Sequence, residues 1–174
     1  MDLKSKIREI PDWPEKGVSF KDITPLLQDK EAFGFSIDKL CEPFDNAQEK
    51  PDMIVGIDAR GFILSAAMAY KLKTGLAIIR KKGKLPHKTI YQDYKLEYAT
   101  NTIEMHEDAI QKGQKVLLVD DVLATGGTME ATAQMVEKLG GKIIGISFLI
   151  ELDFLKGREK LGNYKTNSLI HYES

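Results

Sequence analysis

The sequence predicts an α/β domain with a mainly parallel central sheet flanked by helices. Two strand-loop-helix units carry this prediction. An apolar run at 53–58 precedes a helical pattern at 62–73, and a second run at 115–122 precedes apolar residues at helical spacing between 129 and 139. Both runs are apolar almost throughout, as in strands buried on both faces of a parallel sheet. Since no repeat, linker or low-complexity tract divides the 174 residues, we expect one domain covering 1–174.

The first 46 residues are expected to begin and end as helices. Leu3 and Ile7 have one-face helical spacing within 2–9, and Pro11 ends that pattern. Residues 12–27 combine two prolines and a glycine with interleaved aromatics, which predicts an ordered but irregular segment. We therefore expect residues 1–28 to form an N-terminal hood, followed by an amphipathic helix over 30–46.

The loop after the strand at 53–58 brings an arginine to the end of that strand. Arg60 stands beside Gly61, and a guanidinium next to a glycine loop suits a diphosphate. The alternative is a surface arginine paired with Asp58.

A third strand, at 76–79, runs into a basic segment with the cations Arg80, Lys81, Lys82, Lys84 and Lys88. Because it follows the carboxyl end of a strand, we expect a lid over an anionic substrate; the alternative is a solvated surface loop. Alternating residues at 91–98 and a further run at 102–105 predict a hairpin arm. Residues 80–98 are thus expected to form a mobile catalytic loop, and further strands are expected at 142–150 and 168–172.

The most informative stretch is Val119-Asp120-Asp121-Val122-Leu123-Ala124-Thr125-Gly126-Gly127-Thr128. Its glycines and hydroxyls, at a helix N-terminus beyond the carboxyl end of a strand, suit a phosphate. The two acids would repel that phosphate, so they are better suited to accept hydrogen bonds from sugar hydroxyls or to help hold a divalent cation. Together they indicate a sugar phosphate, although two acids and a turn could also simply end a strand.

Composition and missing motifs exclude several classes of protein. The formal net charge of -1 argues against a dedicated nucleic-acid binder, and no stretch approaches a membrane span or a signal peptide, so a cytoplasmic protein is expected. The P-loop and dinucleotide glycine patterns are absent, which disfavours nucleoside triphosphatases and dinucleotide enzymes. One cysteine, Cys41, and three histidines without ligand spacing offer no covalent nucleophile and no protein-built zinc site.

The stretch at 119–128 resembles the phosphoribosyl-diphosphate (PRPP) motif of the type I phosphoribosyltransferases. The similarity extends, in chain order, to segments 17–27, 57–62, 80–86, 96–98 and 155–161. The resemblance implies the type I phosphoribosyltransferase fold. The segments at 17–27 and 96–98 resemble the members that use adenine, which implies transfer of the phosphoribosyl group of PRPP to N9 of adenine, giving AMP and pyrophosphate in purine salvage.

The resemblance also implies roles for individual residues. Asp120 and Asp121 would hold the ribose hydroxyls, and the 5′-phosphate would be wrapped by Ala124, Thr125, Gly126, Gly127 and Thr128. The diphosphate would be bound by Arg60, Arg80, Lys81 and Lys84, with a non-proline cis peptide commonly preceding the arginine of the 58–61 loop. The adenine would be bound by Ser19, Phe20 and Lys21.

The implied chemistry places positive charge on the anomeric carbon and negative charge on the leaving diphosphate. Arg60 would stabilise the leaving group, and Glu97 would be the general acid/base at N7 of adenine. Mg²⁺ would come with the substrate rather than with a dedicated protein site. A homodimer is implied by family similarity, with no nucleic acid or membrane as partner. Two rivals stay open: an enzyme of the same family that uses a 6-oxopurine, and a regulator that binds PRPP without turnover.

Overall fold

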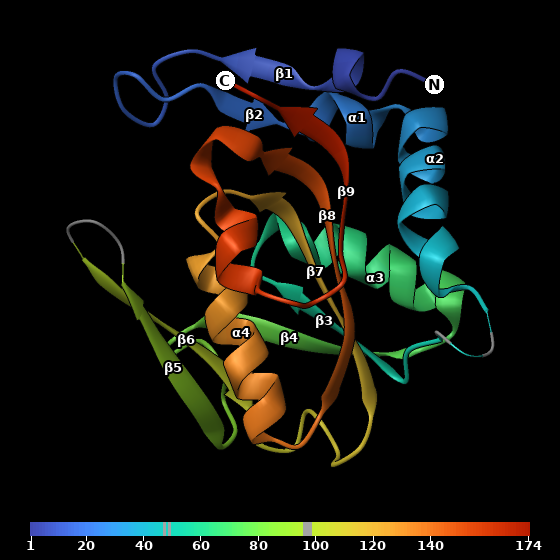
Figure 1. The fold of residues 1–174 in the computed structure, drawn as a ribbon, viewed down its shortest axis with the longest axis vertical. Coiled ribbons are helices and arrows are strands. Elements are labelled where there is room, and N and C mark those ends of the chain that lie inside the picture. Colours follow the sequence, from blue (N-terminus) through green and yellow to red (C-terminus); the bar gives the residue numbers. More distant parts are fainter. Residues whose placement is uncertain (47, 49, 96–98) are drawn as a thin grey trace. The chain divides into compact units, whose positions relative to one another are not determined.

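The computed structural model describes residues 1–46, 48, 50–95 and 99–174. Two compact units make up the chain, Met1–Lys39 and Leu40–Ser174. The first contains the whole of the expected hood at 1–28, and the second contains the seven-stranded sheet (Figure 1). That the chain works as one domain stays a prediction.

The first unit is built on a short antiparallel pair of strands. The 3₁₀ helix η1 (Lys4–Lys6) leads into β1 (Arg8–Ile10), which pairs with β2 (Phe20–Asp22); α1 (Thr24–Gln28) and α2 (Lys30–Cys41) follow. The helix expected over 2–9 is therefore wrong beyond its first turn. Local spacing of Leu3 and Ile7 is outweighed by the cross-strand pairing of residues 8–10 with 20–22, which no local pattern reveals. The helix expected over 30–46 ends at Cys41 and continues as η2 (Glu42–Phe44).

The second unit is a seven-stranded sheet in the order β5-β6-β4-β3-β7-β8-β9. The five strands from β4 to β9 in that order are mutually parallel, and β5 and β6 add an antiparallel edge. This confirms the mainly parallel sheet. The strand bounds are β3 (Met53–Ile57), β4 (Gly75–Lys81), β5 (Thr89–Lys95), β6 (Thr100–His106), β7 (Lys115–Leu123), β8 (Lys142–Leu152) and β9 (Thr166–Tyr172).

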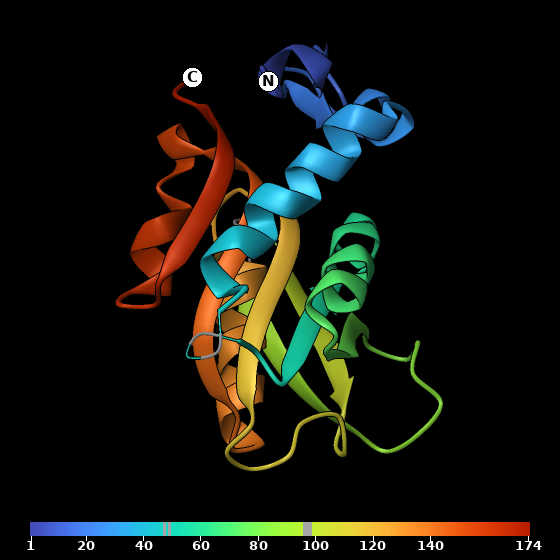
Figure 2. The ribbon, with the colours of Figure 1, turned by 90° about the vertical axis from the view of Figure 1, so that its right-hand side faces the viewer.

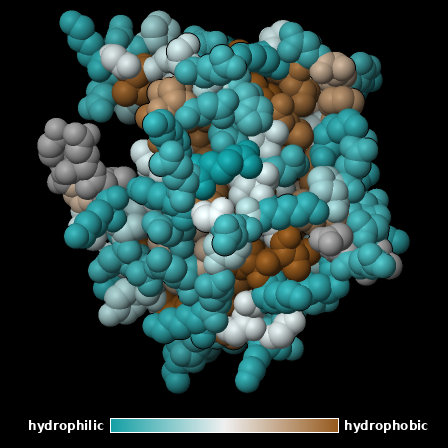
Figure 3. Space-filling view, in the orientation of Figure 1, coloured by the Kyte–Doolittle hydropathy of each residue, from teal (hydrophilic) through white to brown (hydrophobic). Residues whose placement is uncertain are grey.

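Helices cover both faces of this sheet. In Figure 1, α4 (Gly127–Lys138) lies in front of the strands and α3 (Arg60–Leu72) behind them, and the turned view in Figure 2 separates the same two layers. The α4 layer packs on a core of fully buried side chains from the central strands, including Val55, Val116, Leu118, Ile146 and Phe148. Burying these strands on both faces explains their continuous apolar sequences. Figure 3 shows that the face turned to the viewer in Figure 1 is mainly hydrophilic, with hydrophobic residues showing between the elements.

The segment expected as one mobile loop has more regular structure than the sequence suggested. β4 continues through Lys81, a turn covers 82–88, and β5 runs from Thr89 to Lys95 against β6. Residues 96–98, which include Glu97, lie outside the described residues. Among the helices that the structure describes, none is long and apolar enough to cross a membrane.

Candidate active site

Three loops meet at one edge of the sheet because three neighbouring strands are parallel. Ile57 of β3 is level with Ile79 of β4, and Gly56 of β3 is level with Val119 of β7. The residues that follow these positions, at 58–61, 80–88 and 120–128, therefore lie at the same carboxyl edge, where ligands bind in open α/β sheets. The three sites predicted separately from the sequence converge there.

The loop between β7 and α4 surrounds a small pocket of about 70 Å³. Gly126, at φ +85°, precedes α4 and accepts the backbone hydrogen bond of Glu130 at 2.9 Å, the first of that helix. The first turn of α4 leaves N–H donors unpaired by the helix itself. An anion-binding loop was predicted here, and the pocket is lined by Asp120, Val122, Leu123, Ala124, Thr125, Gly126, Gly127, Thr128, Met129 and Phe148.

The two acids at the end of β7 have different surroundings. Asp121 is 7% exposed, and its Oδ2 lies 2.7 Å from Nε of Arg60. The Oδ1 of Asp120 accepts a hydrogen bond from the Asp121 backbone N–H at 2.8 Å. Burial, followed by repulsion from the Asp121 carboxylate, raises the pKa of Asp120 well above its usual value. A hydroxyl donor or a cation at this position would stabilise the ionised form of Asp120.

The loop after β3 reaches the acids closely. A Cβ on Gly61 would lie 2.6 Å from Oδ1 of Asp120, so glycine is required for this approach. The peptide between Asp58 and Ala59 is cis, as the resemblance implied for this loop. Arg60 pairs with Asp121, while Asp58 accepts a hydrogen bond from Nε of Arg80 at 3.0 Å. The alternative of Arg60 as a surface residue is not supported, since its partner is a buried acid of the PRPP motif.

The sequence did not reveal what lies behind the β7–α4 loop. The 3₁₀ helix η4 (Gly157–Leu161) packs there so tightly that a Cβ on Gly157 would lie 2.2 Å from the carbonyl oxygen of Ala124. Arg158 then donates its Nε–H to Oε1 of the buried Glu151 at 2.9 Å and also bonds the Thr166 carbonyl at 2.8 Å. These contacts anchor η4 to β8 and β9 and support the loop from behind.

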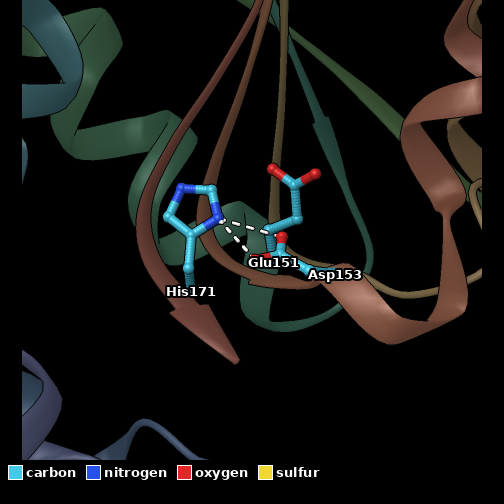
Figure 4. A group of neighbouring side chains, drawn as sticks. All are labelled: Glu151, Asp153 and His171. Carbon is cyan, nitrogen blue, oxygen red and sulfur yellow. Dashed lines mark hydrogen bonds and ion pairs between the residues drawn. The ribbon is translucent and has the colours of Figure 1, made fainter. Parts of the chain in front are cut away.

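A second group that the sequence did not reveal joins Glu151 on β8, Asp153 and His171 on β9. Figure 4 shows the imidazole of His171 facing Asp153, and the Nδ1–Oδ1 distance is 3.0 Å. The three residues offer ligand atoms within 4.8 Å of one another. However, Glu151 is already paired with the Arg158 guanidinium, whose charge opposes a cation at this position. Spacing in the sequence could not show the group because its members come from separate elements that are neighbours only in the sheet.

The residues expected to bind adenine belong to the first unit. Phe20 meets Trp13 edge-on, with ring centroids 4.4 Å apart and an interplanar angle of 66°. Lys21 is only 6% exposed, and its Nζ bonds Glu9 at 2.5 Å and Oγ of Ser19 at 3.1 Å. These side chains are thus fixed by neighbours within their own unit, and their contact with a base stays a prediction.

The fold, with its three loops at one carboxyl edge, is that of a phosphoribosyl-transfer domain. The model of the phosphoribosyl transferase domain family matches residues 26–169. The adenine phosphoribosyltransferase of Thermotoga sp. strain RQ2 is 56% identical over 173 residues, covering 99% of this chain and 100% of that protein.

Solved structures agree with this class. The crystal structure of adenine phosphoribosyltransferase from Thermoanaerobacter pseudethanolicus has a TM-score of 0.94 at 50% identity and covers 98% of each chain. The yeast adenine phosphoribosyltransferase, complexed with an imino-altritol bisphosphate and adenine, has a TM-score of 0.88 at 37% identity over 95% of this chain and 94% of that one. The chain belongs to the adenine phosphoribosyltransferase family of type I phosphoribosyltransferases.

Proposed function

We propose that the protein transfers the phosphoribosyl group of PRPP to N9 of adenine, giving AMP and pyrophosphate. The observation that carries this proposal is the pocket between β7 and α4, where phosphate donors stand beside two acids that suit ribose hydroxyls. Family membership over nearly the whole chain supports adenine as the acceptor. The reaction is a purine salvage step.

Different groups of residues in the donor site would bind different parts of PRPP. Backbone N–H groups and hydroxyls of 124–128 would wrap the 5′-phosphate, while Asp120 and Asp121 would accept hydrogen bonds from the ribose. The diphosphate would lie toward the loops after β3 and β4, where the cations are Arg60, Arg80, Lys81 and Lys84. The ion pairs of Arg60 with Asp121 and of Arg80 with Asp58 hold the two arginines at this edge.

The base would be held by the N-terminal hood. Phe20 is proposed to stack on the adenine ring, and the backbone around Ser19 and Lys21 to meet its edge. The support is the resemblance of this segment to adenine-using relatives, together with the fixed arrangement of Trp13, Phe20 and Lys21 within the first unit. A rigid platform loses little entropy on binding a flat base.

Catalysis would come from cationic side chains that are already positioned around the diphosphate before its bond to the anomeric carbon breaks. As the bond from the anomeric carbon to the diphosphate breaks, negative charge grows on the leaving group, and Arg60 with the loop cations would stabilise it. Glu97 is proposed as the general acid/base at N7 of adenine: its carboxylate would accept the imidazole proton from N7 as N9 attacks, and would return that proton to N7 of AMP in the reverse reaction. Closure of residues 80–98 would exclude water and strengthen these interactions.

Mg²⁺ is the proposed cofactor and would be held by the diphosphate and ribose oxygens of the substrate. When bound, it supplies further positive charge to the leaving group. The residues present fit such an ion, because Asp120 and Asp121 are neighbouring acids at the end of β7 and carboxylate oxygens are ligands that Mg²⁺ prefers. The raised pKa of Asp120 marks a position where added positive charge is favourable.

We also propose that the protein is a cytoplasmic homodimer that uses small-molecule substrates and has no nucleic-acid or membrane partner. Family similarity supports the dimer, and the single cysteine and the near-neutral net charge support the other assignments. Light scattering after size-exclusion chromatography measures the oligomeric state directly.

The test is pyrophosphate release from PRPP and Mg²⁺ with adenine, hypoxanthine, guanine and xanthine supplied separately. We expect release with adenine and little with the 6-oxopurines. Pyrophosphate release with hypoxanthine and not with adenine would show that the protein uses a 6-oxopurine as its acceptor base. PRPP binding with no release for any base would instead favour the regulator.

A further inference from the structure

A buried acid outside the predicted site lies beneath the basic segment. Glu104 of β6 is 4% exposed and is level with Arg80 in the antiparallel pairing of β4 and β6. Its Oε1 accepts hydrogen bonds from the backbone N–H groups of Lys84 at 3.0 Å and Leu85 at 2.8 Å. Its Oε2 accepts one from the hydroxyl of Thr89 at 3.4 Å. One carboxylate thus connects the middle of the turn at 82–88 with the first residue of β5.

These contacts keep Glu104 ionised. Burial alone would raise its pKa, but the backbone N–H groups of Leu85, Gly83 and Lys84 outweigh burial and hold the pKa below its usual value. A buried carboxylate that accepts several N–H groups is a strong and directional anchor.

The anchor acts on the backbone of the turn and not on the ammonium groups of its lysines. Repulsion between the like charges of Lys82 and Lys84 destabilises this turn, and a buried anion offsets that repulsion. Glu104 accepts its hydrogen bond from the Lys84 backbone N–H, and the Lys84 residue itself is exposed. An anion that binds at this edge can therefore meet its ammonium group.

We propose that Glu104 is a positioning residue for the diphosphate part of the donor site. It fixes the turn at 83–85 so that Lys84 and the cross-strand neighbour Arg80 are arranged before PRPP binds. This inference rests on the proposed function, since it assumes that the basic segment meets the diphosphate. Glu104 itself does not contact the reacting atoms.

A positioning role for Glu104 and a purely structural role predict different effects on the binding of the three ligands PRPP, pyrophosphate and AMP. PRPP and pyrophosphate both carry the diphosphate, whereas AMP shares only the ribose 5′-phosphate with PRPP. Loss of the anchor should therefore weaken binding of PRPP and pyrophosphate and leave AMP binding unchanged. Damage to the fold would weaken the binding of all three.

The experiment measures Kd by titration calorimetry for PRPP, pyrophosphate and AMP, each with Mg²⁺, for wild type, Glu104→Ala, Glu104→Gln and the exposed control Glu107→Ala. We expect Glu104→Ala to raise Kd for PRPP and pyrophosphate by about tenfold or more, since charge-assisted hydrogen bonds are lost. Glu104→Gln keeps an acceptor for Lys84 and Leu85 but not the charge, so its increase should be smaller, about threefold. The control should bind all three ligands like wild type.

Equal weakening of AMP and PRPP, or unchanged PRPP binding in both Glu104 variants, would overturn the inference. If Glu104→Ala does not fold, the Kd values of Glu104→Gln for the three ligands test the inference by themselves. Failure of the proposed function is a separate result, because wild type itself would then release no pyrophosphate with any base.

Discussion

Nε of Arg60 lies 2.7 Å from Oδ2 of Asp121, so the loop after β3 neutralises an acid at the end of β7. This ion pair joins two segments that are far apart in the sequence and were predicted independently as binding sites. It also leaves the neighbouring Asp120 half-buried beside a like charge. The relationship has consequences for both stability and catalysis.

The Arg60–Asp121 pair should stabilise the folded protein measurably. Asp121 is buried, so Arg60→Gln leaves a carboxylate without its cation and should cost about 2 kcal/mol of unfolding free energy. In a double-mutant cycle by urea denaturation with Asp121→Asn, the double variant should lose less than the sum of the single losses, by about 1 kcal/mol or more. Strictly additive losses would show that the pair does not couple.

The same double-mutant cycle can also be measured through catalytic activity. Because Arg60 is proposed to stabilise the leaving diphosphate, Arg60→Gln should lower kcat/KM for PRPP by about 100-fold or more. Asp121→Asn cannot restore this loss, because it does not replace the guanidinium at the diphosphate. Recovery of activity in the double variant would remove Arg60 from the chemistry.

Asp120→Asn should make the protein more stable and less active. Burial and the charge of Asp121 raise the pKa of Asp120, so the folded protein binds this proton more tightly than the unfolded chain does. Wild type therefore loses stability as the pH rises from the unfolded pKa, about 4, through the folded pKa. Asparagine does not titrate and keeps an acceptor for the Asp121 N–H.

At pH 7 the variant should gain about 1 kcal/mol, or about 2–4 °C in Tm, and the gain should vanish below about pH 4. The exposed Asp45→Asn is the control and should shift Tm little at either pH. A Tm for Asp120→Asn at or below that of wild type at pH 7 would contradict the account.

Gly157→Ala should weaken every ligand that carries the ribose 5′-phosphate. The new Cβ would lie 2.2 Å from the Ala124 carbonyl oxygen, so the phosphate loop must move. We expect Kd for AMP and PRPP to rise together by about tenfold or more, in contrast to the Glu104 variants. Gly34→Ala in α2 is the control: apart from its chain neighbours and the nearby backbone of its own helix, no described atom lies within 4 Å of the added Cβ. This variant should gain about 0.5–1 kcal/mol of stability without changing either Kd. Unchanged AMP affinity in Gly157→Ala would show that η4 does not support the loop.

Glu97→Ala should lower kcat far more than it changes KM for PRPP. Glu97 lies outside the described residues, and its proposed role as general acid/base rests on the family resemblance. Loss of such a group lowers kcat by about 10²–10⁴-fold. Steady-state kinetics beside the exposed Glu107→Ala measures this, and an unchanged kcat would remove Glu97 from the mechanism.

Contiguous features of the site could be predicted from the sequence. Asp120 to Thr128 form one strand-loop-helix stretch, so the functional side chains and the spacing between them can both be read from consecutive residues. The partner of Arg60, the anchor at Glu104 and the contact of Gly157 with Ala124 could not be predicted, because each joins residues brought together only by strand order or by the return of the chain. The helix expected over 2–9 failed for the same reason, since residues 20–22 decide the structure of 8–10.

The most direct test of the central claim is a competition for limiting PRPP. The protein is incubated with Mg²⁺, PRPP and equal concentrations of adenine, hypoxanthine and guanine, and the nucleotide products are separated by chromatography. We expect AMP to form almost alone and in proportion to the pyrophosphate released. IMP or GMP as the main product, or loss of PRPP without any nucleotide, would show that the protein is not an adenine-specific transferase.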